Sequence, residues 1–252
     1  MLPDSVKAFI DSEIAANTTD YTDLRAVFLN GTLKRSPEVS HTDALIEISS
    51  HILRGVGAQV DEVRTVDHVI PPGVYPDMRE RGWPTDDFPA IYRELIEPAD
   101  IVVLATPIWL GDQSSMTRLM IERLYGWSSE LNAASQWSYY GKTGGALITG
   151  NEDGGKHCAA QMLYALSHIG FTIPPQADAY WTGEAGPGPS YRDEDNQGAR
   201  NHWTTRNTVF ATWNLLHTAR RLVDGGGVPA YGNRTANWDL SDQDHPNPEY
   251  RA

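Results

Sequence analysis

A glycine-, hydroxyl- and cation-bearing loop follows the first apolar run of the chain. It begins at Gly31, carries Lys34 and Arg35, and precedes a predicted helix. Hydroxyls, cations and the free amides of a helix N-terminus can together hold one phosphate monoester. The alternative is that the hydroxyls only cap the helix and the cations are solvated. The candidate phosphate-binding residues are Gly31, Thr32, Lys34, Ser40, His41 and Thr42.

A second loop follows the apolar segment that begins at Ile101. Residues 101–111 predict a strand buried on both faces that runs into a Thr-Pro-aromatic turn and then a helix. Such a turn can present backbone amides to the polar edge of a ring, and the Trp109 indole can lie against a planar ligand. Packing of Trp109 at the helix start is the alternative. The candidate residues are Thr106, Pro107, Ile108, Trp109, Leu110 and Gly111.

A third loop, with the sequence GNEDGGKH, follows the apolar run 144–149. Its glycines would allow the backbone to approach a ligand closely, although an ordinary turn and helix entry is the alternative. Loops after parallel strands meet at one edge of an open α/β sheet, where ligands bind. We therefore expect the three loops to form one pocket. The candidate residues here are Thr149, Gly150, Asn151, Gly154 and Gly155.

The elements that must position these loops alternate between strand and helix. Strands are predicted at 24–30, 59–65, from 101, at 142–149 and from 171–173. Apolar residues at helical spacing predict helices from about 43 to 55, at 89–97, around 116–124, around 159–166 and at 205–223. This order predicts a doubly wound, five-stranded parallel sheet in a three-layer α/β/α sandwich.

The chain divides into three predicted parts. Residues 1–23 form an N-terminal arm, 24–224 the α/β domain, and 225–252 an extended C-terminal tail. Residues 71–90, 128–141 and 181–200 read as long irregular connections or insertions, and the 181–200 loop is expected on the surface near the pocket. The charged runs 86–87 and 192–195 are predicted to be solvated.

Composition narrows the function classes. The 252 residues are 40% hydrophobic and carry a formal net charge of −13, which argues against a nucleic-acid partner because such binding needs Lys and Arg. No apolar run approaches the roughly 20 residues of a membrane span, and no secretory signal is evident. Cys158 is the single cysteine, predicted as a buried thiol. We expect a cytoplasmic protein without a metal site.

The three loops together carry a family resemblance. Neither a GxGxxG nor a P-loop pattern is present. Over residues 24–175 the chain resembles the flavodoxin-like NAD(P)H-dependent FMN reductases and quinone reductases. The first loop is similar to their phosphate loop, TPIWLGDQSSMTRLMIERLYG to their Thr-Pro-aromatic-x-Gly motif, and TGNEDGGKH to their third flavin loop. His41 stands where relatives often have Asn, and the connection 71–90 lacks the cysteines found in many relatives.

The resemblance implies a flavodoxin-like fold, noncovalent FMN, and NAD(P)H as co-substrate. It implies an oxidoreductase (EC 1.5/1.6-like) that passes hydride from the nicotinamide through FMN to a quinone, flavin or similar small acceptor. No protein acid or base is assigned, and a homodimer or homotetramer is expected. Two alternatives stay open, an FMN-binding electron carrier without nicotinamide turnover and a non-catalytic interaction protein on this fold.

Overall fold

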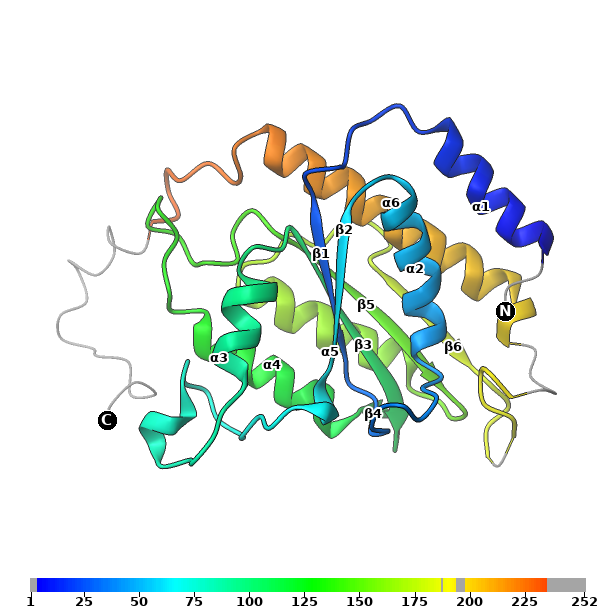
Figure 1. The fold of residues 1–252 in the computed structure, drawn as a ribbon, viewed down its shortest axis with the longest axis horizontal. Helices are drawn as coiled ribbons and strands as arrows, with labels where there is room; N and C mark the ends of the chain where they lie inside the picture. Colours follow the sequence, from blue (N-terminus) through cyan, green and yellow to red (C-terminus); the bar gives the residue numbers. More distant parts are fainter. Residues whose placement is uncertain (1–3, 187, 194–197, 235–252) are drawn as a thin grey trace.

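A parallel sheet forms the centre of the computed structural model, which describes residues 4–186, 188–193 and 198–234. Five parallel strands lie in the order β2-β1-β3-β5-β6, and a short strand, β4, pairs antiparallel with β3 (Figure 1). The five-stranded parallel sheet of a flavodoxin-like fold is therefore confirmed. The bounds are β1 Arg25–Asn30, β2 Gln59–Arg64, β3 Ile101–Trp109, β4 Asp112–Gln113, β5 Thr143–Gly150 and β6 Asp178–Thr182.

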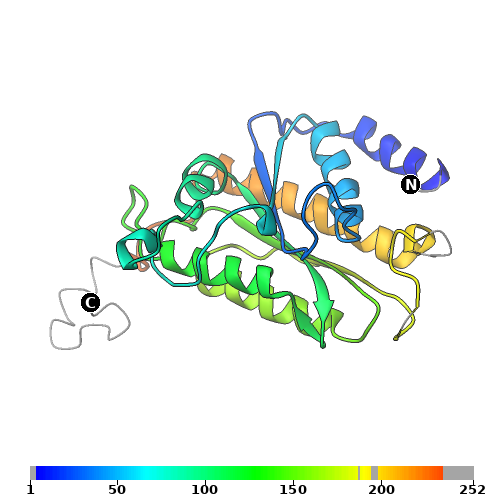
Figure 2. The same cartoon turned by 60° about the horizontal axis from the view of Figure 1, so that its bottom comes forward.

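Helices cover both faces of this sheet, so the molecule has three layers (Figure 2). One face carries α2 and α6, with α1 packed outside α2, and the other carries α3, α4 and α5. The strands β1, β3 and β5 are buried on both faces, as their continuous apolar runs predict. The bounds are α1 Asp4–Ala16, α2 Asp43–Gly55, α3 Phe88–Ile91, α4 Ser115–Trp127, α5 Gly155–His168 and α6 His202–Asp224.

The N-terminal segment predicted as an arm contains α1. Ile10 of α1 is almost fully buried, and Ile14 lies so close to Gly55 of α2 that a β-carbon there would be 2.8 Å from it. At the other end, the Gln136 amide donates to the Val228 carbonyl at 3.1 Å and to Asn233 Oδ1 at 3.0 Å. The start of the predicted tail thus contacts the 128–141 segment, whereas positions 235–252 lie outside the described residues.

The fifth strand lies later in the chain than predicted. Thr172 forms only an isolated bridge with Thr143, and the strand that completes the sheet is β6. Pro174 and Pro175 follow the predicted strand at once, and proline cannot donate to a sheet ladder. Phe171 instead packs against Tyr139, with ring centroids 4.7 Å apart.

The second predicted helix is irregular. Residues 88–91 form α3, and the chain then widens into a π-helical turn, Tyr92–Ile96. The wider turn accompanies a stack of the Tyr92 ring on the Trp127 indole, with centroids 4.0 Å apart. Among the described residues, short 3₁₀ turns also form at Thr65–Asp67, Met78–Arg81 and Gly198–Arg200.

Asp86 is buried, so the prediction that it is solvated was wrong. Its carboxylate lies 2.7 Å from Arg123 Nη2 of α4, and both side chains are fully buried. The same carboxylate accepts the amides of Met78 and Phe88 at 2.9 and 3.0 Å, while Arg123 donates to the Pro76 carbonyl. Desolvation lowers the pKa of Arg123 despite the attraction of Asp86. The pair fastens the long 71–87 connection to the helical layer.

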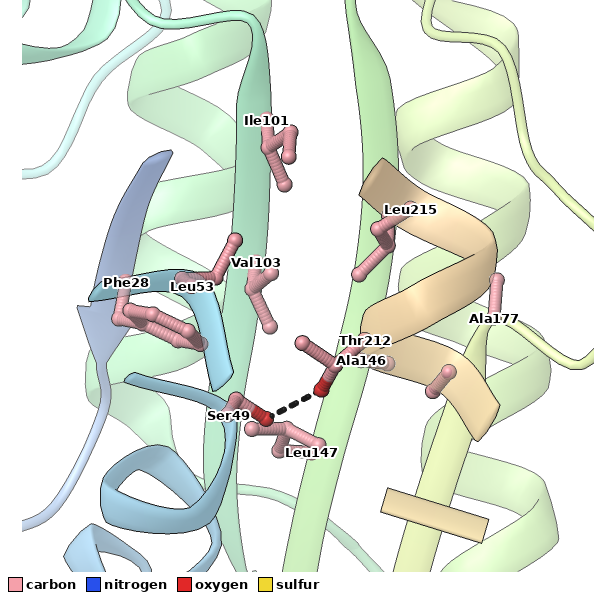
Figure 3. Close-up of a pocket in the computed structure, with 11 residues that line it drawn as sticks. Phe28, Ser49, Leu53, Ile101, Val103, Ala146, Leu147, Ala177, Thr212 and Leu215 are labelled. Atoms are coloured by element: carbon pink, nitrogen blue, oxygen red, sulfur yellow. Dashed lines mark hydrogen bonds between the residues drawn. The ribbon is translucent and has the colours of Figure 1, made fainter. Parts of the chain in front are cut away.

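A small cavity of about 10 Å³ lies between the sheet and the α2–α6 layer (Figure 3). Figure 3 shows the Ser49 and Thr212 hydroxyls pointing toward each other, and they hydrogen bond at 2.8 Å. The surrounding side chains are mostly apolar, and the volume is at about the lower limit for holding a single water molecule. The cavity is therefore a packing void and not a ligand site.

Cys158 is buried in α5, as predicted, and burial raises the pKa of its thiol to about 11. In the described ranges, no helix combines the length and apolar character required to cross a membrane. The same ranges contain no cluster of three or more His, Cys, Asp or Glu side chains placed to hold a metal ion.

The buried pair gives a stability prediction. Asp86→Ala leaves the Arg123 guanidinium buried without a counter-charge, which should lower the free energy of unfolding by about 3–5 kcal/mol. Urea denaturation followed by circular dichroism measures this loss. Glu122→Gln removes the exposed partner of Arg118 and should cost no more than about 1 kcal/mol. Equal midpoints for the two variants would show that the buried pair does not hold the connection.

Candidate functional site

The three predicted loops meet at the carboxyl edge of the sheet, the lower edge in Figure 1. The Thr42 hydroxyl before α2 and the Thr149 hydroxyl near the end of β5 lie 2.9 Å apart, and both residues are buried. The Ser114 hydroxyl at the start of α4 donates to the Gly31 carbonyl at 2.5 Å. These contacts place the first loop between the starts of α2 and α4.

The first loop has backbone donors without acceptors where α2 begins. Among the described residues, the backbone amides of Ser40, His41 and Thr42 donate no hydrogen bond. The Ser40 side chain is fully buried, and its hydroxyl only accepts a long bond, 3.4 Å, from the Asp43 amide. Free amides and the positive end of the helix dipole favour an anion here. The loop therefore fits a phosphate.

A polar network around the buried Asn30, which the sequence analysis did not identify, supports this loop. Asn30, at the end of β1, donates to Glu62 at 3.0 Å and to the Asp43 carboxylate. Arg64, at the end of β2, binds Asp43 Oδ2 at 2.5 Å and the Glu38 carbonyl at 2.8 Å. Burial raises the pKa of Glu62. Two sequence features could have predicted this network. Asn30 is a polar residue at the end of an apolar strand, and Glu62 and Arg64 alternate in β2.

Lys34 and His41 make contacts within the protein. The Lys34 ammonium donates to the Val39 carbonyl at 3.2 Å and lies 3.8 Å from Glu38. His41 Nδ1 accepts the Arg192 amide at 3.1 Å. Burial, followed by the nearby Lys34 ammonium, lowers the pKa of His41. The 188–193 segment therefore lies beside the phosphate loop, close to where the sequence predicted it.

The second loop turns later than predicted. Thr106 and Pro107 continue β3, which runs to Trp109, and the chain reverses at Leu110 and Gly111, with φ of 53° and 80°. The turn is delayed because β4 pairs back onto Ile108 and Trp109. The Thr106 hydroxyl remains structural: it accepts the Ser114 amide at 3.0 Å and donates to the Pro107 carbonyl.

The tip of this hairpin is exposed and apolar. Trp109 is 55% exposed and Leu110 is 95% exposed, whereas Ile108 is buried. Trp109 is therefore free to contact a planar ligand and is not a core packing residue. Glu152 of the third loop accepts the Leu110 amide at 2.8 Å, which fixes the tip but removes that amide as a donor to a ligand.

The glycines permit close packing between protein segments. A β-carbon at Gly154, where φ is 131°, would lie 2.5 Å from the Gly111 carbonyl oxygen. A β-carbon at Gly31 would overlap the Thr117 hydroxyl, and those at Gly150 and Gly155 would be 2.7 Å from Ile108 and 2.6 Å from Tyr180. These glycines therefore allow close contact with a neighbouring loop, two strands and a helix of the protein, not with a ligand as expected.

The third loop also contacts the 188–193 segment. The Asn151 amide donates to the Gly188 carbonyl at 2.7 Å and to the Ser190 hydroxyl at 3.2 Å.

His157 lies outside this group of loop residues, 3.8 Å from Asp112. The edge therefore offers an anion site beside α2 and an exposed indole. None of the hydrogen bonds among the described candidate residues joins a nucleophile to a general base.

Comparison with known proteins gives a strong structural match. The structure of RosB with bound 8-demethyl-8-formylriboflavin-5'-phosphate has a TM-score of 0.76 and 32% sequence identity, covering 91% of this chain and 90% of that chain. The 8-demethyl-8-aminoriboflavin-5'-phosphate synthase of Streptomyces davaonensis is 37% identical over 207 residues, which are 80% of this chain and 79% of the relative.

A second relative is much longer than this chain. A Mycobacterium bovis protein named divalent metal cation transporter MntH is 60% identical over 208 residues, 82% of this chain but only 30% of that protein. The model of the NADPH-dependent FMN reductase family matches residues 24–185, the region that contains all three loops. This match confirms the resemblance drawn from the motifs. The chain belongs to the NADPH-dependent FMN reductase family, whose cofactors are FMN and NAD(P)H.

Proposed function

We propose that the chain binds FMN at the carboxyl edge of its sheet, with the phosphate at the start of α2 and the flavin ring beside Trp109. The observation that carries this proposal is that the backbone amides of Ser40, His41 and Thr42 donate no hydrogen bond among the described residues. The buried Ser40 hydroxyl lies next to them. The chain as a whole carries a net charge of −13 and would repel an anion, but this cluster of hydrogen-bond donors can bind one locally.

The residues of the chain would hold and orient the cofactor. The Ser40, His41 and Thr42 amides and the Ser40 hydroxyl would hold the phosphate, and the Asn30–Asp43–Arg64 network keeps this loop in shape. The exposed Trp109 indole would lie against the ring and exclude water from it. When bound, FMN supplies two-electron redox chemistry between a nicotinamide and an acceptor. We assign no side chain as a catalytic acid or base.

The finer proposal is a reductase that takes hydride from NAD(P)H and delivers it to a quinone, a flavin or a similar small acceptor, acting as a homodimer or homotetramer. The exposed tip at Trp109 and Leu110 supports it, because an open ring face is needed for two substrates to bind in turn. An electron carrier without nicotinamide turnover is the competing reading.

A second candidate function treats the flavin phosphate as a substrate. It is favoured by the Streptomyces relative, named as a synthase of 8-demethyl-8-aminoriboflavin-5'-phosphate, and by the RosB structure, which holds a modified riboflavin phosphate. Both relatives cover most of this chain. The same phosphate site at α2 would serve either function.

Phosphate recognition is tested by Lys34→Met combined with Ser40→Ala. The double change should weaken FMN binding more than tenfold, because each charge-assisted bond contributes about 1.5–3 kcal/mol, and should leave riboflavin affinity nearly unchanged. Quenching of flavin fluorescence gives both dissociation constants. Lys7→Met, on exposed α1, is the control. Equal losses for both flavins would place the phosphate elsewhere.

Contact between the second and third loops is tested by Gly154→Ala. The new β-carbon would meet the Gly111 carbonyl and shift the Trp109 tip, so FMN affinity should fall about tenfold or more. Gly82→Ala is the matched control, because Gly82 also has positive φ, 90°, but its β-carbon would meet nothing within 4 Å. Normal FMN binding by Gly154→Ala would separate the third loop from the flavin site.

Anaerobic stopped-flow mixing of the FMN-loaded protein with NADPH distinguishes the candidate functions. A reductase should lose its flavin absorbance within milliseconds to seconds and regain it when a quinone is added. A carrier should not be reduced at a useful rate. A change in the mass of the flavin during incubation of the FMN-loaded protein with crude cell metabolites would favour the synthase-like candidate.

A further inference from the structure

Arg192 lies outside the region matched by the family model, yet the fold brings it to the start of α2. Its backbone amide donates to His41 Nδ1 at 3.1 Å across 151 positions of sequence. Its Nη2 atom lies 2.7 Å from Glu47 Oε1, on the second turn of α2. Arg192 is therefore partly buried, with a side chain 27% exposed, and not solvated as predicted, whereas Asp193 is 51% exposed. Glu194 and Asp195 of the same run lie outside the described residues.

The segment that carries Arg192 is held from three sides. Asn151 of the third loop binds Gly188 and Ser190, and His41 binds the Arg192 amide. The buried Tyr191 ring packs edge-on against Trp181, with centroids 5.4 Å apart. The segment 188–193 therefore bridges the first and third loops and fixes the main chain of Arg192 beside the phosphate loop.

Two nitrogens of the Arg192 guanidinium have no hydrogen-bond acceptor among the described residues. Its contact with Glu47 is close but poorly aligned, and neither buried nitrogen, Nε or Nη2, forms a hydrogen bond with any described residue. Glu47 is 68% exposed, so water weakens its hold on Arg192. Burial, Lys34 and Arg192 lower the pKa of the His41 imidazole, whereas Asp193, whose carboxylate is 4.0 Å from His41 Nε2, and Asp43 raise it. Two cations, Lys34 and Arg192, therefore lie near the start of α2 together with these carboxylates.

We propose that Arg192 is a phosphate-binding residue, supplied by the 188–193 segment, that makes the site selective for flavins carrying a 5'-phosphate. The guanidinium needs only to exchange the misaligned contact with Glu47 for a phosphate oxygen, and its planar fork suits such a partner. This inference rests on the proposed function, because it assumes that a flavin binds at this edge.

The test compares FMN and riboflavin binding by fluorescence quenching in the full-length protein. Arg192→Gln keeps the backbone amide that binds His41 but removes the charge, and should weaken FMN binding about fivefold to twentyfold with little change for riboflavin. Arg192→Lys should restore part of the FMN affinity, since an ammonium is a single point donor. Glu47→Gln, which frees the guanidinium, should leave FMN affinity unchanged or tighter.

Arg79→Gln is the control for loss of a surface cation, because Arg79 pairs with Asp77 on the distant 78–81 turn. An unchanged FMN affinity in Arg192→Gln would overturn the inference while leaving the proposed function intact. An equal loss for FMN and riboflavin would also overturn it, since Arg192 would then only hold the segment in place. If the unmodified protein bound neither flavin, the proposed function itself would fail.

Discussion

Parallel pairing of β1, β3 and β5 in register is the constraint on which the rest of the site depends. It pairs Asn30 with Ala105 and Pro107 with Thr149, so the three strands end at one edge of the sheet, with β3 extending beyond the end of β1. Each strand end leads into a loop at this edge, where the loops contact one another directly. The Thr42–Thr149 pair and the Gly111–Gly154 approach follow from that shared edge.

To bind an anion, the carboxyl edge of the sheet must keep backbone N–H donors free although the protein as a whole is acidic. The carboxylate of Asp43, at the first position of α2, would repel an anion if it were unpaired. Arg64 and Asn30 engage it from the neighbouring strands, while the amides just before it stay unused. The Asp43 charge is thus paired with Arg64 and Asn30, and the amides beside it keep no hydrogen-bond acceptor among the described residues, which suits an anion site.

The α2 side of this edge and the hairpin tip are held in different ways. The α2 side is held by the partly buried Arg64–Asp43 ion pair and the hydrogen bonds of Asn30, whereas the Trp109–Leu110 tip extends into solvent on a tight turn. Leu110 has positive φ, a conformation that costs a branched residue free energy, and Glu152 fixes it through the Leu110 amide. An exposed apolar tip held in one position is suited to contact a flat ring from one side.

The sequence alone determined the fold class, the three loop positions and the family, because buried parallel strands appear as continuous apolar runs and loop chemistry is local. It also indicated that Cys158 is buried. The site of the fifth strand, the turn at Leu110, the burial of Asp86 and the position of Arg192 were decided only by tertiary structure. Each depends on a partner far away in sequence, Arg123 for Asp86 and His41 for Arg192, and local pattern does not specify such partners.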